Sequence, residues 1–337
     1  MSALGRAFPE DDMSERAIQP LISIALCTYN GAPYLREQLE SLLAQTYRNI
    51  EIIAVDDHSA DDTLAILKEY ERRDARLRAV ANSENLGFRK NFEYAMSLCV
   101  GVFVAPCDQD DVWLPDKLRL LIDAIGDHAL AYCDSEFVDE RGRSLNNAMS
   151  ENVVMVSTND PTIFAAGNCV SGHAMLFRRE LLERALPVPD GFYYDWWLAA
   201  VGSSTGGIIY CDRQLVKYRL HDSNVTDVLR SRSVARQRGY RWVQLHEFRR
   251  RLEHLAALPG DRSPFIARLR DLWTAREEQW LSLALALFIF RHAPRVFLLR
   301  KPARGRLKYA LQFTIGLRLK RLSNRYGYVP GTPTDTA

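Results

Sequence analysis

Short apolar runs alternate with longer amphipathic runs from residue 21 onward. The short runs are apolar or β-branched and end at turn residues, so they predict buried strands at Leu21–Cys27, Ile50–Val55, Leu77–Ala81 and Val102–Ala105. Apolar residues at helical spacing between them predict three helices, over Pro33–Gln45, Asp61–Arg73 and Phe88–Leu98. This order predicts an α/β fold in which a mostly parallel sheet is flanked by helices.

The alternation is less regular after residue 126. The pattern there predicts further strands at Ala129–Cys133, Ile208–Cys211 and Leu215–Arg219. It also predicts a strand that runs into a short helix, over Asn168–Phe177 and Arg179–Ala185. Two amphipathic stretches with basic flanks predict a C-terminal helical extension, with helices over Trp280–Leu299 and Arg306–Leu322.

The net charge of +2 hides an uneven distribution along the chain. Residues 228–337 carry 23 Lys and Arg against 7 Asp and Glu, whereas the first 227 residues carry 21 against 35. An acidic body followed by a basic tail predicts two parts that meet different partners. We therefore expect four segments: a flexible tail over 1–19, a main domain over 20–228, a basic amphipathic helical region over 229–326 and a flexible tail over 327–337.

Cysteine usage and hydropathy indicate the compartment. The six cysteines form no C-x-x-C pair, so we expect reduced core side chains rather than a disulfide framework or a zinc site. Acidic residues near the N-terminus interrupt any apolar stretch that a signal peptide would need. The longest apolar stretch, Trp280–Phe290, is shorter than the about 20 residues of a membrane-spanning helix. These features predict a cytoplasmic protein.

The basic tail mixes arginines with tryptophan and phenylalanine. Basic amphipathic helices of this composition are typical of proteins that lie on an anionic membrane surface, here the inner face of the cell membrane. The other interpretation is a helical bundle that packs on the main domain and leaves its arginines in solvent. No nucleic-acid-binding module is recognisable, so we expect no nucleic-acid partner.

Polar residues follow three of the predicted strands at the point where each strand ends. They are Thr28, Tyr29 and Asn30 after the first, Asp56 and Asp57 after the second, and Asp108 to Asp111 after the fourth. Ligands of such sheets bind beyond the carboxyl ends of the strands, so these clusters predict a site at one edge. No G-x-G-x-x-G turn and no phosphate-binding loop occurs, which argues against a dinucleotide dehydrogenase or a phosphate-loop nucleotidase.

Three carboxylates, those of Asp108, Asp110 and Asp111, follow one buried strand directly. Their repulsion favours a bound cation, and carboxylate oxygens together with substrate phosphates suit a divalent metal such as Mg²⁺ or Mn²⁺. The alternative is an acidic turn that caps the helix beginning near Pro115. Asp56 and Asp57 are open to two interpretations as well, contacts to a nucleoside or helix capping.

Several motifs in a fixed order resemble family 2 glycosyltransferases with the GT-A fold. They are Ser23–Gly31, Leu42–Tyr47, Glu51–Ser59, Asn85–Gly87 and Cys107–Leu118. The resemblance covers residues 20–225 and implies that the main domain is a GT-A catalytic domain. It implies that a nucleoside-diphosphate sugar contacts Thr28, Tyr29, Asn30, Asp56, Asp57, Asn85, Lys90, Asp108, Arg219 and His221.

The resemblance also implies a metal site and a catalytic base. Asp108 and Asp110 match the metal-binding D-x-D, with Mg²⁺ or Mn²⁺ as cofactor, and Asp195 matches the base of inverting members. The acidic side chain of Asp195 also suits the N-cap of the helix that follows it.

The implied function is inverting transfer of a sugar to a hydroxyl of a glycan or lipid-linked acceptor in cell-surface polysaccharide assembly. Asp108–Trp113 and Asp195–Trp197 resemble the rhamnosyltransferase branch, which implies dTDP-L-rhamnose as donor, although these motifs do not define the sugar. Gln237–Trp242 is one residue longer than the Q-x-x-R-W of processive synthases. The remaining alternatives are a sugar nucleotidyltransferase and an inactive membrane-surface scaffold with the same fold.

Overall fold

The computed structural model describes residues 19–221, 238–299 and 311. The predicted tails over 1–19 and 327–337 lie outside these residues, except Gln19, as does the predicted helix over Arg306–Leu322, except Leu311. Within the described ranges, no helix has the length and apolar character needed to cross a bilayer.

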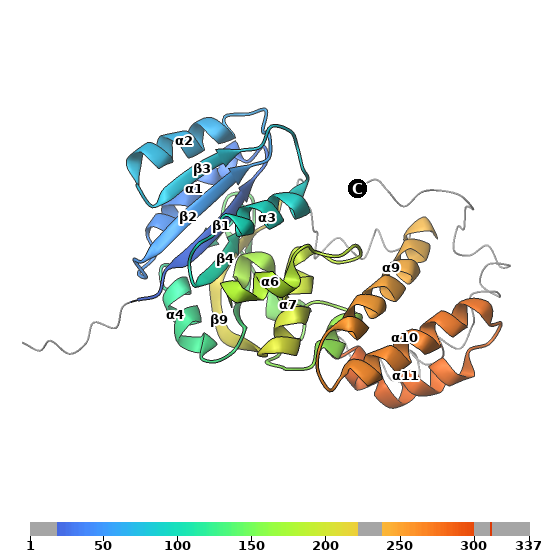
Figure 1. Cartoon of the computed structure of the whole chain (residues 1–337). Coiled ribbons are helices and arrows are strands. Elements are labelled where there is room, and N and C mark those ends of the chain that lie inside the picture. The colour runs from blue at the N-terminus through green and yellow to red at the C-terminus, as the bar shows by residue number, and fades with distance from the viewer. Residues whose placement is uncertain (1–18, 222–237, 300–310, 312–337) are drawn as a thin grey trace, which may run out of the picture.

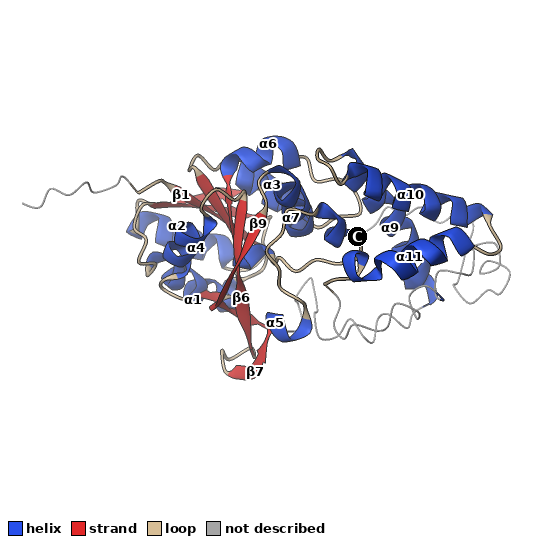
Figure 2. Ribbon diagram, turned by 90° about the horizontal axis from the view of Figure 1, so that it is seen from below, coloured by secondary structure: helices blue, strands red, loops and turns tan. Residues whose placement is uncertain are grey.

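The centre of the molecule is a nine-stranded mixed sheet (Figures 1 and 2). Its strands are β1 (Ile22–Thr28), β2 (Ile50–Asp56), β3 (Leu77–Ala81), β4 (Phe103–Cys107), β5 (Val112–Trp113), β6 (Leu130–Val138), β7 (Ser144–Ala148), β8 (Met175–Arg178) and β9 (Ile208–Arg219). Their order is β3-β2-β1-β4-β8-β6-β9-β5, with β7 paired to β6. The first four are mutually parallel, and β8 runs antiparallel to both β4 and β6. The predicted mostly parallel α/β sheet is confirmed.

Helices cover both faces of this sheet (Figure 1). They are α1 (Ala32–Leu43), α2 (Thr63–Arg73), α3 (Phe88–Ser97), α4 (Lys117–Ile125), α5 (Met149–Asn152), α6 (Leu182–Ala185) and α7 (Tyr194–Thr205). Alternation along β1 separates two cores: Ile24 and Leu26 pack with residues of α1, α2 and α4, while Ala25 and Cys27 pack with residues of α3 and α7. Both faces of β1 are therefore buried, which explains why Ser23 and Thr28 are its only polar residues.

The predicted strand over Asn168–Phe177 is only partly present. The chain forms a 3₁₀ turn at Gly172–Ala174, and β8 begins at Met175. A β-carbon at Gly172 would lie 1.9 Å from the Tyr194 hydroxyl oxygen, so this backbone packs tightly against the start of α7. The predicted helix over Arg179–Ala185 is observed as a 3₁₀ turn, Arg179–Leu181, followed by α6. Long-range packing overrides the local pattern at Gly172.

Three further helices form a lobe beside the sheet (Figure 1): α9 (Arg238–Ala257), α10 (Ser263–Glu278) and α11 (Leu283–Val296). Their inner faces join the core that contains α3 and α7. The Arg295 guanidinium also donates from Nε to the Asp160 carboxylate at 2.7 Å. Asp160 in turn caps a 3₁₀ helix, η1 (Pro161–Ala165), by accepting from the Thr162 amide at 3.0 Å. The described helices thus pack on the α/β body, as the bundle interpretation expects.

The central position of β1 gives a test of the fold. Leu26 is completely buried in the core formed with α1, α2 and α4, so we expect Leu26→Ala to lower the free energy of unfolding by about 2–5 kcal/mol. Leu145 is 43% exposed, and the same replacement there should change stability by less than about 0.5 kcal/mol. Urea denaturation of the two variants measures the difference, and equal stabilities would contradict the assignment of β1 to the core.

Candidate active site

The parallel strands bring the predicted polar clusters to one edge of the sheet. Thr28 is in register with Asp56, and Leu26 is in register with Cys107, the residue before Asp108. The Asp57 amide donates to the Thr28 carbonyl at 2.8 Å, which continues this pairing past the strand ends. The three polar clusters therefore lie together at this edge of the sheet.

Asp56 and Asp57 organise the backbone and hydroxyl groups at the end of β2. The Asp56 carboxylate accepts hydrogen bonds from the hydroxyls of Thr28, at 3.0 Å, and Ser59, at 2.6 Å. The Asp57 carboxylate accepts from the amides of Leu86 and Gly87, at 2.8 and 2.9 Å, and so holds the Asn85–Gly87 turn. Neither caps the next helix, because Asp61 accepts from the amide of its first residue, Thr63.

The other predicted donor contacts lie on the exposed rim of this edge of the sheet. Tyr29 is 49% exposed, and its amide and carbonyl are held by the Gln109 side chain at 2.8 and 3.0 Å. Asn30 receives a hydrogen bond from the Ala60 amide at 2.9 Å. Asn85, in the turn, and Lys90, in the first turn of α3, are exposed. This rim combines an accessible aromatic ring with hydrogen-bonding groups.

Asp111 is the most deeply buried member of the acidic cluster, with no exposed surface. One of its oxygens accepts from the Arg219 amide at 3.0 Å, while the other, Oδ2, has no hydrogen-bond partner. Burial, and then the charges of Asp110 and Asp108, raise the pKa of Asp111 well above its ordinary value. An orphaned buried carboxylate oxygen beside two further acids is a suitable ligand for a cation.

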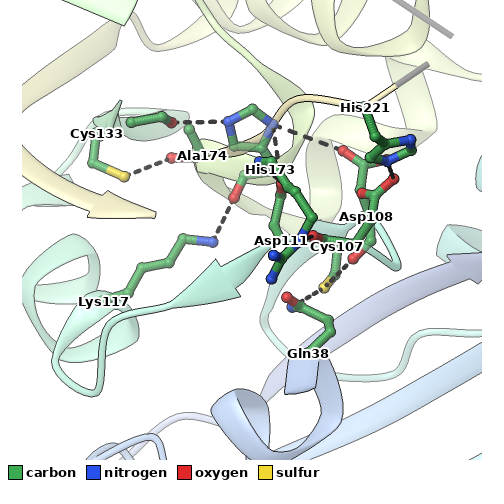
Figure 3. Close-up of polar contacts among 12 residues, drawn as sticks. Gln38, Cys107, Asp108, Asp111, Lys117, Cys133, His173, Ala174 and His221 are labelled. Carbon is green, nitrogen blue, oxygen red and sulfur yellow. Dashed lines mark hydrogen bonds and ion pairs between the residues drawn. The ribbon is translucent and has the colours of Figure 1, made fainter. Parts of the chain in front are cut away.

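His173, which was not predicted, completes this cluster (Figure 3). Its Nδ1 lies 3.6 Å from Asp111 and 3.7 Å from Asp108, and its Nε2 is 2.8 Å from the Ser135 hydroxyl oxygen. Asp108, Asp111 and His173 offer ligand atoms that all lie within 4.8 Å of one another. Oxygen and imidazole ligands fit Mn²⁺, and the carboxylates fit Mg²⁺.

A buried lysine, Lys117, contacts the backbone of His173. The Lys117 ammonium donates to the His173 carbonyl at 2.7 Å and lies 2.9 Å from the centre of the Trp113 ring (Figure 3). Burial lowers the pKa of Lys117 to about 7. Lys117 is therefore only partly charged near neutral pH and cannot fully balance the carboxylates.

The end of β9 and the residues after it cover the acids from the other side. His221 Nε2 lies 2.8 Å from Asp110 Oδ2, and its ring stacks on Tyr34 with 4.9 Å between the centroids. Arg219 is buried and donates to the Asp110 carbonyl at 2.8 Å and to the Glu37 carboxylate at 2.6 Å. Both predicted residues therefore contact the acidic segment.

Asp195 lies in the first turn of α7, whose N-cap is Tyr193, so the N-cap interpretation is wrong. Its carboxylate accepts from the Trp196 amide at 2.6 Å. Burial, with a smaller contribution from the charge of Asp108, raises the pKa of Asp195 to about 7, although hydrogen bonds from the Trp196 and Gly172 backbone oppose the rise. A carboxyl with this pKa near the acidic cluster is suited to accept a proton at neutral pH.

Comparison with known proteins identifies the class of this site. Residues 23–186 match the sequence model described as "Glycosyl transferase family 2". An uncharacterized glycosyltransferase from Haemophilus influenzae is 27% identical over 229 residues, which are 62% of this chain and 68% of that protein. Residues 23–186, just under half of the chain, are therefore similar to glycosyl transferase family 2.

Solved structures show the same fold at low sequence identity. Staphylococcus aureus TarS 1–349 in complex with UDP-GlcNAc superimposes with a TM-score of 0.55 at 19% identity, over 91% of this chain and 85% of that one. The Pyrobaculum calidifontis mannosyltransferase PcManGT, in complex with GDP-Man and Mn²⁺, has a TM-score of 0.50 at 18% identity, over 92% and 88%. These similarities confirm the GT-A fold.

The raised pKa of Asp195 predicts a pH-dependent stability. An unfolded aspartate titrates near about 3.9, so the folded state binds this proton more tightly, and its contribution to the free energy of unfolding falls between about pH 4 and pH 7. In metal-free protein, Asp195→Asn should be about 1–3 kcal/mol more stable than wild type at pH 8 and close to wild type at pH 4.5. Urea denaturation at both pH values measures this, and an equal difference at both would show that Asp195 titrates normally.

Proposed function

We propose that the chain is an inverting glycosyltransferase that transfers a sugar from a nucleoside-diphosphate donor to a hydroxyl of a glycan or lipid-linked acceptor. In this proposal residues 20–228 form the catalytic domain and 229–326 a basic helical region. The observation that carries the proposal is the proximity of Asp195, a carboxyl with a pKa of about 7, to the Asp108–Asp111 cluster. Asp195 can accept a proton while the Asp108–Asp111 cluster receives the diphosphate.

The reaction assigns one step to each part of the site. Ionised Asp195 takes the proton from the acceptor hydroxyl as that oxygen attacks the anomeric carbon from the face opposite the diphosphate. The new carbon–oxygen bond forms as the bond to the diphosphate oxygen breaks, so the anomeric configuration inverts. Thr28, Tyr29, Asp56 and Asp57 hold the nucleoside, and Asn30, Asn85 and Lys90 contact the donor from the rim. Arg219 and His221 belong to the segment Tyr218–His221, which covers the diphosphate in this proposal.

Asp108 and Asp110 are the proposed metal ligands, as the D-x-D motif implies. A divalent ion held by these residues would supply positive charge that offsets the charge of the leaving diphosphate. The sequence motif carries this set, since Asp110 Oδ2 is bonded to His221, and the cluster of Asp108, Asp111 and His173 is the competing set. Asp108 belongs to both.

The donor and the location are narrower parts of the proposal. TarS 1–349 with UDP-GlcNAc and PcManGT with GDP-Man show that this fold accommodates nucleotide sugars. The resemblance of the Asp108–Trp113 and Asp195–Trp197 sequences to rhamnosyltransferases supports dTDP-L-rhamnose as the donor of this chain. We place the protein in the cytoplasm, at the inner face of the membrane, where a lipid-linked acceptor of surface polysaccharide assembly would be presented.

Turnover tests the assigned base. With donor, acceptor and Mn²⁺, kcat/KM should rise with pH through an inflection near about 7, and Asp195→Asn should lower kcat by about 100-fold or more because proton transfer is lost. Release of the nucleoside diphosphate is the readout, since a sugar nucleotidyltransferase would release inorganic diphosphate instead. Asp190→Asn, at an exposed acid that pairs with Arg89, is the matched control and should keep wild-type turnover. Wild-type activity in Asp195→Asn would remove Asp195 from the mechanism.

Metal affinity separates the two ligand sets. We expect Asp108→Asn and Asp110→Asn each to weaken Mn²⁺ binding by at least about tenfold, because even residues that only support metal ligands change affinity by about 10–100-fold. Mn²⁺ titration followed by electron paramagnetic resonance measures this. Asp116→Asn is the control, since Asp116 bonds to Thr46 and Arg119 at the start of α4. Loss of affinity in Asp111→Asn but not in Asp110→Asn would favour the set that includes His173.

A further inference from the structure

Helix α11 is apolar on two faces, and only one of them is used for packing. Leu285, Ile289, Ala293 and Val296 are buried against the rest of the lobe. Leu283, Leu287 and Phe290 lie on the opposite side and are 67%, 51% and 45% exposed. Their spacing places them in one row along the helix.

Neighbouring residues extend this row beyond both ends of the helix. Trp280 and Leu281 precede α11 and are 51% and 57% exposed, and Leu298 follows it at 40%. We call these residues, together with Leu283, Leu287 and Phe290, the α11 face. They are six of the fourteen exposed large apolar side chains in the described residues. A concentration of this kind on one surface marks an interaction site.

Charge indicates what this face meets. In the described residues from 279 to 299 the charged side chains are Arg291, which is exposed and follows Phe290 directly, and Arg295, while the exposed Glu278 precedes Trp280 by two residues. The sequence from residue 300 to residue 334 adds nine Lys and Arg and no Asp or Glu. A second copy of the face would bring like charges together, whereas an anionic surface would be attracted. Exposed leucine, phenylalanine and tryptophan beside basic residues are typical of helices that lie in the headgroup region of a bilayer.

The dimensions of α11 agree with a helix lying in the plane of a membrane. The helix has 14 residues, and a helix needs about 20 to cross a bilayer. Figures 1 and 2 show α11 at the edge of the helical lobe rather than between the lobe and the sheet. Trp280, near its start, is of the residue type that favours the boundary between headgroups and acyl chains.

Packed contacts connect this helix to the candidate active site. Arg295 of α11 bonds to Asp160, which caps η1. The carbonyl of Phe164 in η1 accepts from the Trp196 indole Nε1 at 2.7 Å, and Trp196 follows Asp195 in the chain. The orientation of α11 on a surface therefore determines how Asp195 is oriented relative to that surface.

We propose that the α11 face docks the protein on the surface of an anionic lipid bilayer, with its apolar side chains among the acyl chains and Arg291 at the phosphates. The consequence for a lipid-linked acceptor rests on the proposed function, but the docking itself does not require catalysis.

Vesicle sedimentation of the full chain tests the docking. Wild type should sediment with vesicles of phosphatidylglycerol and phosphatidylcholine, and less with phosphatidylcholine alone. The double variant Leu287→Ser with Phe290→Ser should lower the partition coefficient by about tenfold, since both side chains lose apolar contact with the bilayer. Leu145→Ser, at an exposed leucine on β7, is the matched control and should bind as wild type.

Two further readouts keep the outcome clear. Thermal unfolding should give the same midpoint for the double variant as for wild type, because both replaced side chains are about half exposed. Binding of the double variant equal to that of wild type, or no binding of wild type to anionic vesicles, would overturn the proposal. A lipid-free wild-type dimer that the double variant dissociates, seen by sedimentation velocity, would show that a second copy covers this face and would overturn it as well.

Discussion

Repulsion among the carboxylates that follow β4 is the interaction on which the rest of the site depends. Asp108, Asp110 and Asp111 lie within the four residues that follow the buried strand β4, and Asp111 has no exposed surface. Unbalanced charge in such surroundings is costly, and the raised pKa of Asp111 expresses that cost. The protein answers it in part with the amide of Arg219 and the imidazoles of His173 and His221, while burial keeps Lys117 from supplying a full charge.

The sheet explains why groups from distant parts of the chain meet at this point. Parallel pairing of β1 with β2 and β4 aligns Thr28, Asp56 and Asp108 at one edge. The antiparallel β8 brings the turn that precedes it, and with it His173, back to that edge. Tight packing of Gly172 against Tyr194 then holds Asp195 close enough to the cluster for the charge of Asp108 to affect its pKa. The acidic cluster and the Asp195 carboxyl are thereby held near each other by packing between Gly172 and α7.

The sequence predicts the parallel half of the fold well because each of its strands is a short, mostly apolar run, and such a signal is local. The acidic edge follows from the same pattern. His173 could not be found in this way, since its partners come from other elements and the bond to Ser135 spans 38 residues. The turn at Gly172–Ala174 was missed for a related reason: the packing of Gly172 on Tyr194 is not visible in the residues beside it. The N-cap interpretation of Asp195 failed because α7 begins at Tyr194, so that Tyr193 is the N-cap and Asp195 lies inside the first turn.

The central claim is that the acidic cluster binds a nucleoside diphosphate through a divalent ion. Calorimetric titration of dTDP and UDP into the full chain, with and without Mn²⁺, tests it most directly. The account predicts that binding of at least one of them becomes at least about tenfold tighter when Mn²⁺ is present and that Asp108→Asn loses this gain. Equal affinity for both nucleotides with and without Mn²⁺, in wild type and in Asp108→Asn, would contradict it.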